Sequence, residues 1–489
     1  MDHARQIDNL IGQLRALAPD ARGMTADSRR VAAGDVFLAF PGDVHDGRAH
    51  IPAALAAGAA AVLWEPAGHA WHAGAAPQLA VANLRQHAAE LAAAWYGKPS
   101  NNLWMTGITG TNGKTSVSQW LAAAWARLGR KTAAIGTIGN GFPGDMAVAS
   151  HTTPDAVSLQ AMLAAFRDAG AQGVAMEVSS HGLHQGRVAE VAFDVAVLTN
   201  LTQDHLDYHG DMASYAAAKA RLFAWPGLKW AVLNADDELG ASLESQLRGG
   251  VTRVLSYGLH GGDICAQRLR ADRDGLRMEI VSPWGMGELR SSLLGEFNAY
   301  NLLAALGALL AGGVKLDDAL AVLGRVAAVP GRMQRVDGEP GEPTVIVDFA
   351  HTPDALDKVL TALKPLTRGR LICVFGCGGG RDTAKRPLMG GIVAARADLA
   401  IVTSDNPRHE APAHIIADIL AGMPPGQHAI VDRREAIGAA IADAAADDIV
   451  LLAGKGHEPY QEINGVRSPF SDVEEARVAL EKRKQRAAT

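Results

Sequence analysis

Short apolar runs alternate with alanine- and leucine-rich segments along most of this chain. The runs have the length and composition of buried strands, and they fall at residues 103–105, 174–176, 195–198, 345–347, 371–375, 399–402 and 449–452. The segments between them have helical composition. Strands that alternate with helices are typical of parallel sheets, so the pattern predicts an α/β protein.

Two breaks in this pattern indicate domain boundaries. A polar, proline-containing stretch at 98–102 precedes the first of these strands, and Pro330 and Gly331 follow a helical region at 298–328. We therefore expect three domains, at 1–98, 99–332 and 333–489.

The segment between the strand at 103–105 and the next helix has the composition of a phosphate-binding loop. It contains Gly110-Thr111-Asn112-Gly113-Lys114-Thr115, and apolar residues at helical spacing follow from Val117 to Leu128. Backbone N–H groups at a helix N-terminus bind phosphate oxygens, Lys114 adds a positive charge, and the Thr115 hydroxyl can ligate Mg²⁺. Ile108 stands where the pattern G-x-x-x-x-G-K-[ST] has glycine. An unrelated glycine-rich turn is the alternative, but the position between strand and helix favours nucleotide binding.

Composition narrows the class of protein. The 489 residues are 48% hydrophobic and 20% charged, as in ordinary globular proteins. A net charge of −6 gives no general attraction to nucleic acid, so a polyanionic ligand would need local cationic groups. Cys265, Cys373 and Cys377 form no metal-binding or disulfide pattern, which favours a reducing compartment and packing roles.

No segment has the pattern of a targeting sequence or a membrane span. The first 19 residues are amphipathic and carry Asp2, Arg5, Asp8 and Arg15. The longest apolar stretch, 302–314, contains three glycines and is too short to cross a bilayer. We therefore expect a cytoplasmic protein that binds neither nucleic acid nor membrane.

Polar clusters follow six of the predicted strands, where the carboxyl ends of parallel strands form the ligand crevice of an open α/β sheet. One such cluster is typically a hydrogen-bonded loop, but six on two sheets indicate two crevices that face each other. The clusters are 177–182, 199–207, 348–351, 376–382, 405–408 and 454–458.

Several residues in or near these clusters are candidates for chemistry. Glu177 and His205 could coordinate Mg²⁺ beside the nucleotide, or they could be hydrogen-bonded loop residues. Lys219 lies in a predicted helix, where a lysine ordinarily faces solvent, and its spacing alone gives it no role. Four basic residues could bind carboxylates or phosphates, namely Arg332, Arg381, Arg408 and Lys455.

Together these motifs resemble those of the Mur ligase family, the ATP-dependent amide-forming enzymes of peptidoglycan precursor synthesis. The resemblance covers nearly the whole chain, and the family's loop accounts for the missing glycine at 108. Its marks are residues 110–115, 177–181, 330–332 and 348–353 with Asn200, Asp204, His205, Lys219, Asn298 and Asn301. The loop 405–408 resembles the branch of the family that adds meso-2,6-diaminopimelate.

The resemblance implies a fold, a reaction and a set of small-molecule partners. The fold would be three α/β domains: a smaller N-terminal domain for the UDP precursor, a central P-loop-type, mostly parallel sheet flanked by helices for ATP, and a Rossmann-like C-terminal domain for the amino acid. ATP would phosphorylate the D-glutamate side chain of UDP-N-acetylmuramoyl-L-alanyl-D-glutamate. The amine of meso-2,6-diaminopimelate would then displace phosphate from the acyl phosphate. A monomer is expected.

The resemblance also implies roles for individual residues. Those that match nucleotide-binding positions are Gly110, Thr111, Asn112, Gly113, Lys114, Thr115, Ser116, Asn301, Arg332 and Asp348. Those that match Mg²⁺ positions are Thr115, Glu177, His205 and Lys219, with Lys219 carbamylated by CO₂ (N6-carboxylysine). The expected catalytic residues are Lys114, Glu177, His205 and Lys219.

Two further groups match substrate positions. The precursor group is Ser28, Asp43, Val44, His45, Thr152, Thr153, Ser179, Gln185 and Arg187. The diaminopimelate group is Arg381, Asp405, Asn406, Pro407, Arg408, Gly454 and Glu458.

Other functions remain as alternatives at this point. A lysine-adding ligase and a folylpolyglutamate synthase-like ligase share the ATP chemistry, and Arg408 favours diaminopimelate over both. Outside the family, a Rossmann-type oxidoreductase could use the glycine-rich loop 377–381, although its spacing is not G-x-G-x-x-G. A non-catalytic ATP-dependent switch is the remaining alternative.

Overall fold

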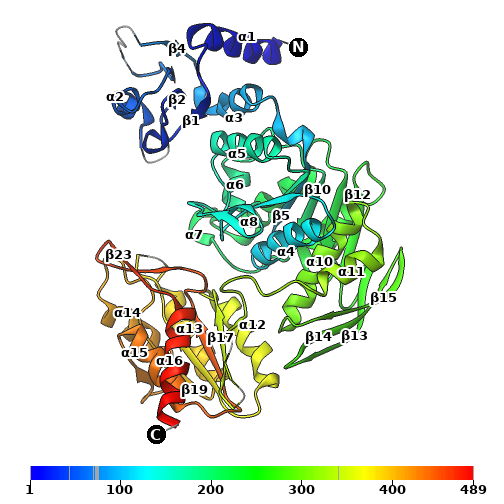
Figure 1. Cartoon of the computed structure of the whole chain (residues 1–489), viewed down its shortest axis with the longest axis vertical. Coiled ribbons are helices and arrows are strands. Elements are labelled where there is room, and N and C mark those ends of the chain that lie inside the picture. The colour runs from blue at the N-terminus through cyan, green and yellow to red at the C-terminus, as the bar shows by residue number, and fades with distance from the viewer. Residues whose placement is uncertain are drawn as a thin grey trace.

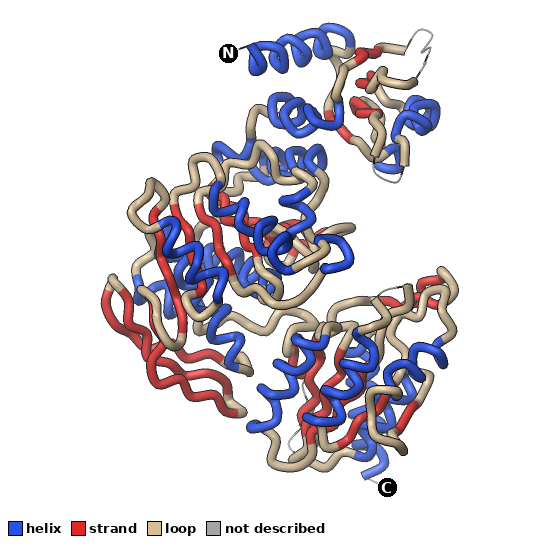
Figure 2. The backbone as a smooth tube through the Cα atoms, turned by 180° about the vertical axis from the view of Figure 1, so that it is seen from behind, coloured by secondary structure: helices blue, strands red, loops and turns tan. Residues whose placement is uncertain are grey.

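Three successive parts of the chain each build a separate sheet. The computed structural model describes residues 2–42, 45–69, 71, 76–336, 338–339, 341–380 and 382–487. The N-terminal, central and C-terminal parts follow one another from one end of the molecule to the other (Figures 1 and 2). The predicted α/β class is therefore confirmed.

The N-terminal part is a four-stranded parallel sheet covered by helices on both faces. Its strands, in spatial order, are β1 (Gly23–Thr25), β2 (Asp35–Ala39), β3 (Ala61–Trp64) and β4 (Gln78–Ala80). Its helices are α1 (Asp2–Leu17), α2 (Ile51–Ala56) and α3 (Leu84–Trp95), with 3-10 turns at Ser28–Arg30 and Gly47–His50. Helices α1 and α3 cover one face and α2 the other. Val157 of the central part completes this core, so the two parts share packing.

The central part is an eleven-stranded sheet. Its strands are β5 (Trp104–Thr109), β6 (Thr132–Ile135), β7 (Asn140–Phe142), β8 (Asp145–Ala147), β9 (Gly173–Glu177), β10 (Val195–Leu198), β11 (Trp230–Asn234), β12 (Arg253–Gly258), β13 (Ile264–Asp272), β14 (Gly275–Ser282) and β15 (Gly285–Ser291). Their order is β15-β14-β13-β12-β11-β10-β5-β9-β6-β7-β8. The middle of the sheet, from β13 to β6, is parallel, as predicted, but both ends are antiparallel hairpins.

Helices cover both faces of the central sheet. They are α4 (Lys114–Arg127), α5 (Ala156–Asp168), α6 (Ser180–His184), α7 (Leu206–His209), α8 (Met212–Ala220), α9 (Glu238–Leu247), α10 (Glu296–Ala311) and α11 (Leu316–Leu323), with 3-10 turns at Pro99–Asn102 and Arg221–Ala224. Helices α4 and α10 pack on one face, and α5 and α9 on the other. The apolar stretch at 302–314 thus lies mainly in the buried helix α10. In the described part of the chain, no helix is long and apolar enough to cross a membrane.

The C-terminal part is a six-stranded sheet between two layers of helices. Its strands, in spatial order, are β16 (Gln334–Val336), β17 (Thr344–Asp348), β21 (Ile449–Ala453), β18 (Leu371–Phe375), β19 (Leu399–Val402) and β20 (His428–Ala429). All pairs are parallel except β16 with β17. The helices are α12 (Pro353–Leu363), α13 (Lys385–Arg396), α14 (Pro412–Leu420), α15 (Arg433–Asp443) and α16 (Asp472–Ala487), with a 3-10 turn at Lys364–Leu366. Helices α12–α14 cover one face and α15–α16 the other.

A two-stranded hairpin, β22 (Tyr460–Ile463) and β23 (Val466–Pro469), extends from the C-terminal part. It follows the polar cluster at 454–458. The sequence pattern did not predict it.

The carboxyl ends of the central and C-terminal sheets meet directly. Asp354, at the start of α12, accepts hydrogen bonds from Asn112 Nδ2 (3.1 Å) and Thr202 Oγ1 (3.0 Å) of the central part. A second contact joins the same two parts, because Arg273 in the turn between β13 and β14 donates to the carbonyl oxygens of Leu366 (2.6 Å) and Asp447 (3.1 Å). The loops at the end of β5 and at the start of α12 therefore form one polar junction.

Candidate active site

The loop between β5 and α4 needs glycine at two positions. Gly110 has a φ of 143° and Gly113 a φ of 88°, which non-glycine residues rarely adopt. A Cβ atom at Gly110 would also overlap Thr199 Oγ1, and one at Gly113 would overlap Asn301 Oδ1. The loop can follow this tight path to the N-terminus of α4 only because both side chains are absent.

The segment after β10 holds this loop in place. Asn200 accepts from the backbone N–H of Thr111 through its carbonyl oxygen (2.8 Å) and from that of Asn112 through Oδ1 (3.0 Å). Its amide nitrogen and the Thr199 hydroxyl both donate to the carbonyl oxygen of Asn112, at 3.1 and 2.6 Å. The remaining N–H groups at the start of α4 are then available for an anion.

Lys114 folds over the loop that precedes it. Its ammonium group donates to the carbonyl oxygens of Gly110 (2.8 Å) and Thr111 (2.9 Å). Burial lowers its pKa, against the opposing effects of Glu177 and Asp204. The positive charge thus lies beside the N–H groups that would bind phosphate.

Glu177 ends β9 as a buried carboxylate beside the loop. It accepts from Thr115 Oγ1 (3.0 Å) and from the backbone N–H and hydroxyl of Thr137, at 2.8 and 3.1 Å. The residue is only 1% exposed, and among the described residues no basic side chain forms an ion pair with it. A carboxylate buried without a cation beside a threonine hydroxyl has the hard oxygen ligands that Mg²⁺ prefers.

A complete protein-only metal site is not formed. Among the described residues, no three His, Cys, Asp or Glu side chains cluster so that they could hold a metal ion. A metal at Thr115 and Glu177 would therefore need further ligands from water, from a substrate or from a modified side chain.

Lys219 is buried, so the expectation that it faces solvent is wrong. It is 1% exposed at the end of α8, where its ammonium group donates to the Gly110 carbonyl oxygen (2.8 Å) and lies 4.3 Å from the centre of the Tyr215 ring. Burial and then the nearby Lys114 lower its pKa well below the usual value. The pocket therefore shifts this side chain toward the neutral, nucleophilic amine.

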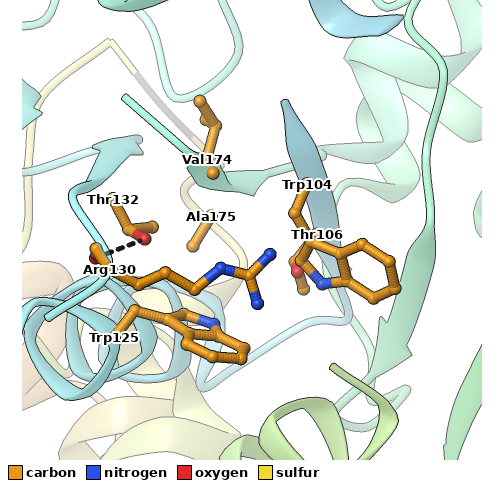
Figure 3. A pocket seen from close by; sticks show the side chains of 8 residues that line it. Trp104, Thr106, Trp125, Arg130, Thr132, Val174 and Ala175 are labelled. Carbon is orange, nitrogen blue, oxygen red and sulfur yellow. Dashed lines mark hydrogen bonds between the residues drawn. The ribbon is translucent and has the colours of Figure 1, made fainter. Parts of the chain in front are cut away.

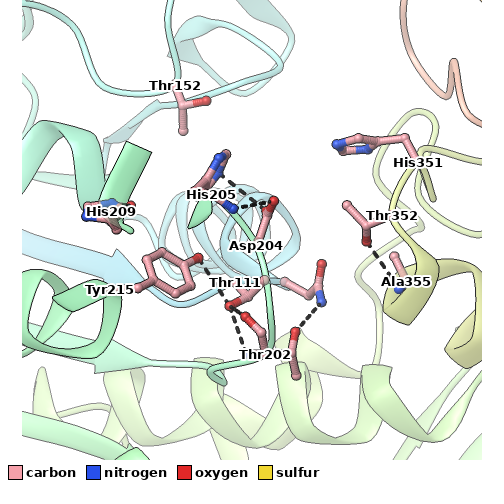
Figure 4. A network of polar contacts seen from close by, with 12 residues as sticks. Thr111, Thr152, Thr202, Asp204, His205, His209, Tyr215, His351, Thr352 and Ala355 are labelled. Carbon is pink, nitrogen blue, oxygen red and sulfur yellow. Dashed lines mark hydrogen bonds and ion pairs between the residues drawn. The ribbon is translucent and has the colours of Figure 1, made fainter. Parts of the chain in front are cut away.

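His205 and Asp204 lie in a polar network (Figure 4), and Lys219 is close enough to affect the pKa of His205. Its Nε2 is 3.4 Å from Asp204 Oδ2, and its backbone has a φ of 55°. Burial lowers its pKa, Asp204 opposes this, and Lys114 and Lys219 lower it further. The imidazole is therefore predominantly neutral at neutral pH and can act as a ligand.

The predicted precursor group of the central part is joined by hydrogen bonds. Thr153 Oγ1 donates to the Glu177 carbonyl oxygen (2.9 Å) and to Ser179 Oγ (3.1 Å), and Ser179 caps α6 through Gly182 N–H. Arg187 donates to the Thr153 carbonyl oxygen (2.9 Å) and to Gln185 Oε1 (2.8 Å). Thr152 connects to Glu177 through the Thr137 hydroxyl, which lies 3.0 Å from Thr152 Oγ1.

The N-terminal members of the precursor group lie on loops of the first sheet. Ser28 begins a 3-10 turn, and the adjacent Arg30 donates to Ser158 Oγ of the central part (3.4 Å). The carbonyl oxygen of His45 accepts from Gly42 N–H (2.8 Å). Asp43 and Val44 lie outside the described residues.

The remaining nucleotide candidates surround the junction with the C-terminal part. Asp348 accepts from the backbone N–H groups of Met333 (2.7 Å) and Ala350 (2.8 Å). The Arg332 guanidinium lies 4.4 Å from the centre of the Phe349 ring, and its buried Nε has no hydrogen-bond partner among the described residues. Asn301 packs against the phosphate loop at Gly113. These groups come from three separate elements.

The diaminopimelate candidates meet at the carboxyl ends of β19 and β21. Asn406 Nδ2 donates to Glu458 Oε2 (2.8 Å), and Arg408 Nη1 donates to the Gly379 carbonyl oxygen (2.6 Å). A Cβ at Gly454, where φ is 113°, would lie 2.7 Å from Asp405 Oδ2. Pro407 is buried between Asn406 and Arg408. Arg381 lies outside the described residues.

Sequence reasoning missed several contributors to this site. Thr137 and Tyr215 contact Glu177 and Lys219, and neither lies in a recognisable motif. The hairpin strand β22 fixes the backbone of Arg408, because Arg408 N–H donates to the Glu462 carbonyl oxygen (3.0 Å). Lys455 was one of four candidates to bind a carboxylate or phosphate, and its fully buried ammonium group contacts the Glu458 carboxylate (3.3 Å) and Asn406 Oδ1 (2.9 Å) within the protein.

A separate small cavity lies at the amino ends of β5, β6 and β9, opposite the phosphate loop (Figure 3). The Arg130 guanidinium lies 4.4 Å from the ring centre of Trp125 and 5.8 Å from that of Trp104. The cavity has no room for a water-sized ligand. It therefore serves packing, and the chemistry belongs to the other edge of the sheet.

The phosphate loop contacts the C-terminal part at the carboxyl ends of that part's strands. A nucleotide on the loop would therefore lie beside a second substrate, as the chemistry of an ATP-dependent ligase requires. Comparison with known proteins identifies the family. Residues 20–96 match the Mur ligase family catalytic domain, 108–309 the Mur ligase middle domain and 331–456 the Mur ligase glutamate ligase domain. The chain belongs to the Mur ligase family.

Similar proteins extend over nearly the whole chain. A Chromobacterium violaceum protein named UDP-N-acetylmuramoyl-L-alanyl-D-glutamate--2,6-diaminopimelate ligase is 54% identical and is matched over 96% of both chains. A Pseudomonas aeruginosa protein of the same name is 52% identical, over 94% of this chain and 95% of that one. A solved structure of a ligase of this name is 39% identical, has a TM-score of 0.67 and covers 96% of this chain and 99% of its own.

Proposed function

We propose that this enzyme joins meso-2,6-diaminopimelate to the D-glutamate of UDP-N-acetylmuramoyl-L-alanyl-D-glutamate at the expense of ATP. The observation that carries the ligase chemistry is the direct contact of Asn112 and Thr202 with Asp354, which sets the phosphate loop against the C-terminal sheet. The choice of amino acid rests on the name shared by relatives about half identical to this chain. A cytoplasmic location follows from this function in precursor synthesis.

Each of the three parts of the chain would bind a different substrate. Residues 1–98 would bind the UDP end of the precursor, 99–332 ATP, and 333–489 the amino acid. Gly110 to Ser116 would surround the phosphates at the start of α4, with Lys114 against the transferred group. Asn301, Arg332 and Asp348 would border the nucleotide, and the buried Nε of Arg332, which has no hydrogen-bond partner among the described residues, would then gain one.

Thr115, Glu177, His205 and a carbamylated Lys219 would hold Mg²⁺. The fit rests on the buried Glu177 carboxylate, which lacks a cation partner among the described residues, and on the neutral state of His205. Bound there, Mg²⁺ would offset the negative charge that builds up on the transferred phosphoryl group.

Carbamylation of Lys219 is chemically favoured by its surroundings. The neutral amine attacks the carbon of CO₂, an N–C bond forms, one C=O electron pair moves to oxygen, and the nitrogen proton passes to solvent. The product is an anion, which suits a pocket that already holds Lys114 better than a second ammonium group does.

The protein groups would act mainly by orientation and charge. Thr152, Thr153, Ser179, Gln185 and Arg187 would orient the muramoyl dipeptide, so that a glutamate oxygen attacks the γ-phosphorus and ADP leaves. The amine of diaminopimelate then attacks the acyl carbon, its proton is lost, and inorganic phosphate departs with the transferred oxygen. Contact between the two sheets would limit access of water to the acyl phosphate.

Arg408 would bind the distal carboxylate that distinguishes diaminopimelate from lysine. Its Nη1 donates to the Gly379 carbonyl oxygen, and the other N–H groups of its guanidinium have no partner among the described residues. Arg408→Ala should therefore raise the KM for diaminopimelate by about ten-fold or more while that for ATP stays nearly unchanged, in steady-state assays that vary each substrate. An equal rise for both substrates would contradict this role.

Oxygen transfer tests the proposed reaction. The dipeptide precursor carries ¹⁸O in both oxygens of the glutamate side-chain carboxylate, and the phosphate released with ATP, Mg²⁺ and diaminopimelate is analysed by mass spectrometry. One ¹⁸O per phosphate is expected, with the other retained in the new amide. Unlabelled phosphate would overturn the acyl-phosphate route.

A further inference from the structure

Lys455 is a buried cation at the base of the amino-acid pocket. It follows β21 directly, between Gly454 and Gly456, and its side chain is fully buried. Its ammonium group lies 2.9 Å from Asn406 Oδ1 and 3.3 Å from Glu458 Oε2. It is therefore unavailable to a substrate, and its contacts are with two groups proposed to bind one.

These contacts fix the orientation of the Asn406 amide. Asn406 Oδ1 accepts from Lys455 and from Glu462 N–H (3.0 Å), both of which can only donate. The amide nitrogen must therefore face Glu458, to which it donates at 2.8 Å. A flipped amide would bring two N–H groups against the Lys455 ammonium and an oxygen against the Glu458 carboxylate, so that all these contacts would be repulsive.

The same contacts fix Glu458. Its Oε2 accepts from both Asn406 and Lys455, which leaves Oε1 without a partner among the described residues. The Asn406 amide nitrogen likewise keeps a second N–H. The pocket thus presents one donor beside one anionic acceptor, which matches the carboxylate and the ammonium group on one carbon of an amino acid.

We propose that Lys455 is a positioning residue that sets the polarity of the amino-acid pocket by orienting the Asn406 amide and the Glu458 carboxylate. This inference rests on the proposed function. Lys455 would select for a zwitterionic amino-acid end without touching it. The contacts of its ammonium group are with Asn406, Glu458 and the Tyr460 ring, and none of these three is a nucleotide candidate.

The test compares Lys455→Met with Lys455→Gln in the full-length enzyme. Methionine and glutamine are both one atom shorter than lysine and unbranched to that point, but methionine cannot donate a hydrogen bond, whereas the glutamine amide can donate toward Asn406 Oδ1. Lys455→Met should raise the KM for diaminopimelate by about ten-fold or more, with kcat and the KM for ATP within about two-fold of wild type. Lys455→Gln should recover part of the loss. Lys364→Met is the matched control, because Lys364 lies in the same part but pairs with Asp398 at the surface.

A double-mutant cycle with Asn406→Ala decides whether Lys455 acts through the amide. In that background, Lys455→Met should change the KM for diaminopimelate by less than about two-fold, because the group that it orients is gone. Additive effects, or equal losses for ATP and diaminopimelate in Lys455→Met and Lys455→Gln, would overturn the inference. A wild-type enzyme without diaminopimelate-dependent turnover would instead overturn the proposed function, so the two failures can be told apart.

Discussion

At the scale of single residues, the Gly110 carbonyl oxygen is shared by two lysines. The ammonium groups of Lys114 and Lys219 each lie 2.8 Å from it. Among the described residues, neither forms an ion pair with a carboxylate, and the more distant Asp204 and Glu177 offset only part of the burial penalty. Burial lowers the pKa of both, and that of Lys219 falls well below its usual value. One lysine can thus serve as a cation and the other as a neutral amine.

Lys114→Ala should reduce turnover to near background without unfolding the protein. In the proposed reaction this charge acts on the transferred phosphate, and electrostatic positioning dominates phosphoryl transfer. ADP release and thermal unfolding should be measured together. Lys229→Ala is the control, since Lys229 is an exposed lysine of the same sheet that pairs with Asp194. Activity within a few-fold of wild type in Lys114→Ala would rule out the nucleotide assignment.

Lys219→Ala should be severely impaired and should recover part of its activity in added formate or acetate, because a small carboxylate can replace the missing carbamate. Wild-type activity at limiting CO₂ should fall as the pH falls through the lowered pKa of Lys219, since only the neutral amine attacks CO₂. Steady-state rates with and without the added acids test this. A fully active Lys219→Ala enzyme in CO₂-free buffer would contradict carbamylation.

The phosphate loop, Glu177 and His205 could be found from sequence because each follows a recognisable strand or motif. The burial of Lys219 could not. Its helix reads Tyr215-Ala-Ala-Ala-Lys219-Ala, in which alanines on every side leave no polar face to compare with an apolar one. Only the tertiary fold shows that this helix lies against the phosphate loop.

At the scale of elements, an ion pair joins the starts of α15 and α16 near the residues proposed to bind the amino acid. Arg433 donates to both carboxylate oxygens of Asp472, at 2.8 and 2.6 Å, and both side chains are fully buried. Arg433 also donates to the Ala453 carbonyl oxygen (3.0 Å), directly before Gly454. The pair thus links two helices to the end of β21, directly before the proposed site residue Gly454.

Arg433→Met should lower the free energy of unfolding of the C-terminal part by about 3–5 kcal/mol, because Asp472 would remain buried and unpaired. The double variant Arg433→Met with Asp472→Leu should recover much of this loss. Urea unfolding followed by circular dichroism measures both. If Arg433→Met is as stable as the wild type, the pair contributes nothing to this junction.

Strands buried on both faces were predictable because they are continuous apolar runs, as with Val195–Leu198 in β10 and Leu371–Phe375 in β18. The hairpins β13–β15 and β22–β23 were not. In β14 and β15 buried and exposed residues are mixed, and β23 is exposed throughout, so neither hairpin leaves a strong apolar signal. Strand β22, which holds the backbone of Arg408, could therefore not be predicted from the pattern of apolar residues.

At the scale of the whole molecule, function depends on how the sheets meet. Asn112 and Asp354 are 242 residues apart in the sequence, yet they are joined by a hydrogen bond at the junction of two ligand edges. The motifs that follow the strands predicted ligand sites at the carboxyl ends of both the central and the C-terminal sheet. The contact between Asn112 and Asp354, in contrast, depends on how these two separately packed parts lie against each other. Membership of the Mur ligase family favours the ligase over the oxidoreductase and the non-catalytic switch.

The most direct test of the enzyme's function is its choice of amino acid. The full-length protein is incubated with ATP, Mg²⁺ and UDP-N-acetylmuramoyl-L-alanyl-D-glutamate, with either meso-2,6-diaminopimelate or L-lysine, and the nucleotide product is weighed by mass spectrometry. We expect the diaminopimelate adduct, with a kcat/KM that exceeds that for lysine by a factor on the order of 10³ or more, because lysine leaves Arg408 unmatched. Comparable values for the two amino acids would contradict the proposed specificity, and no adduct with either would contradict the ligase function.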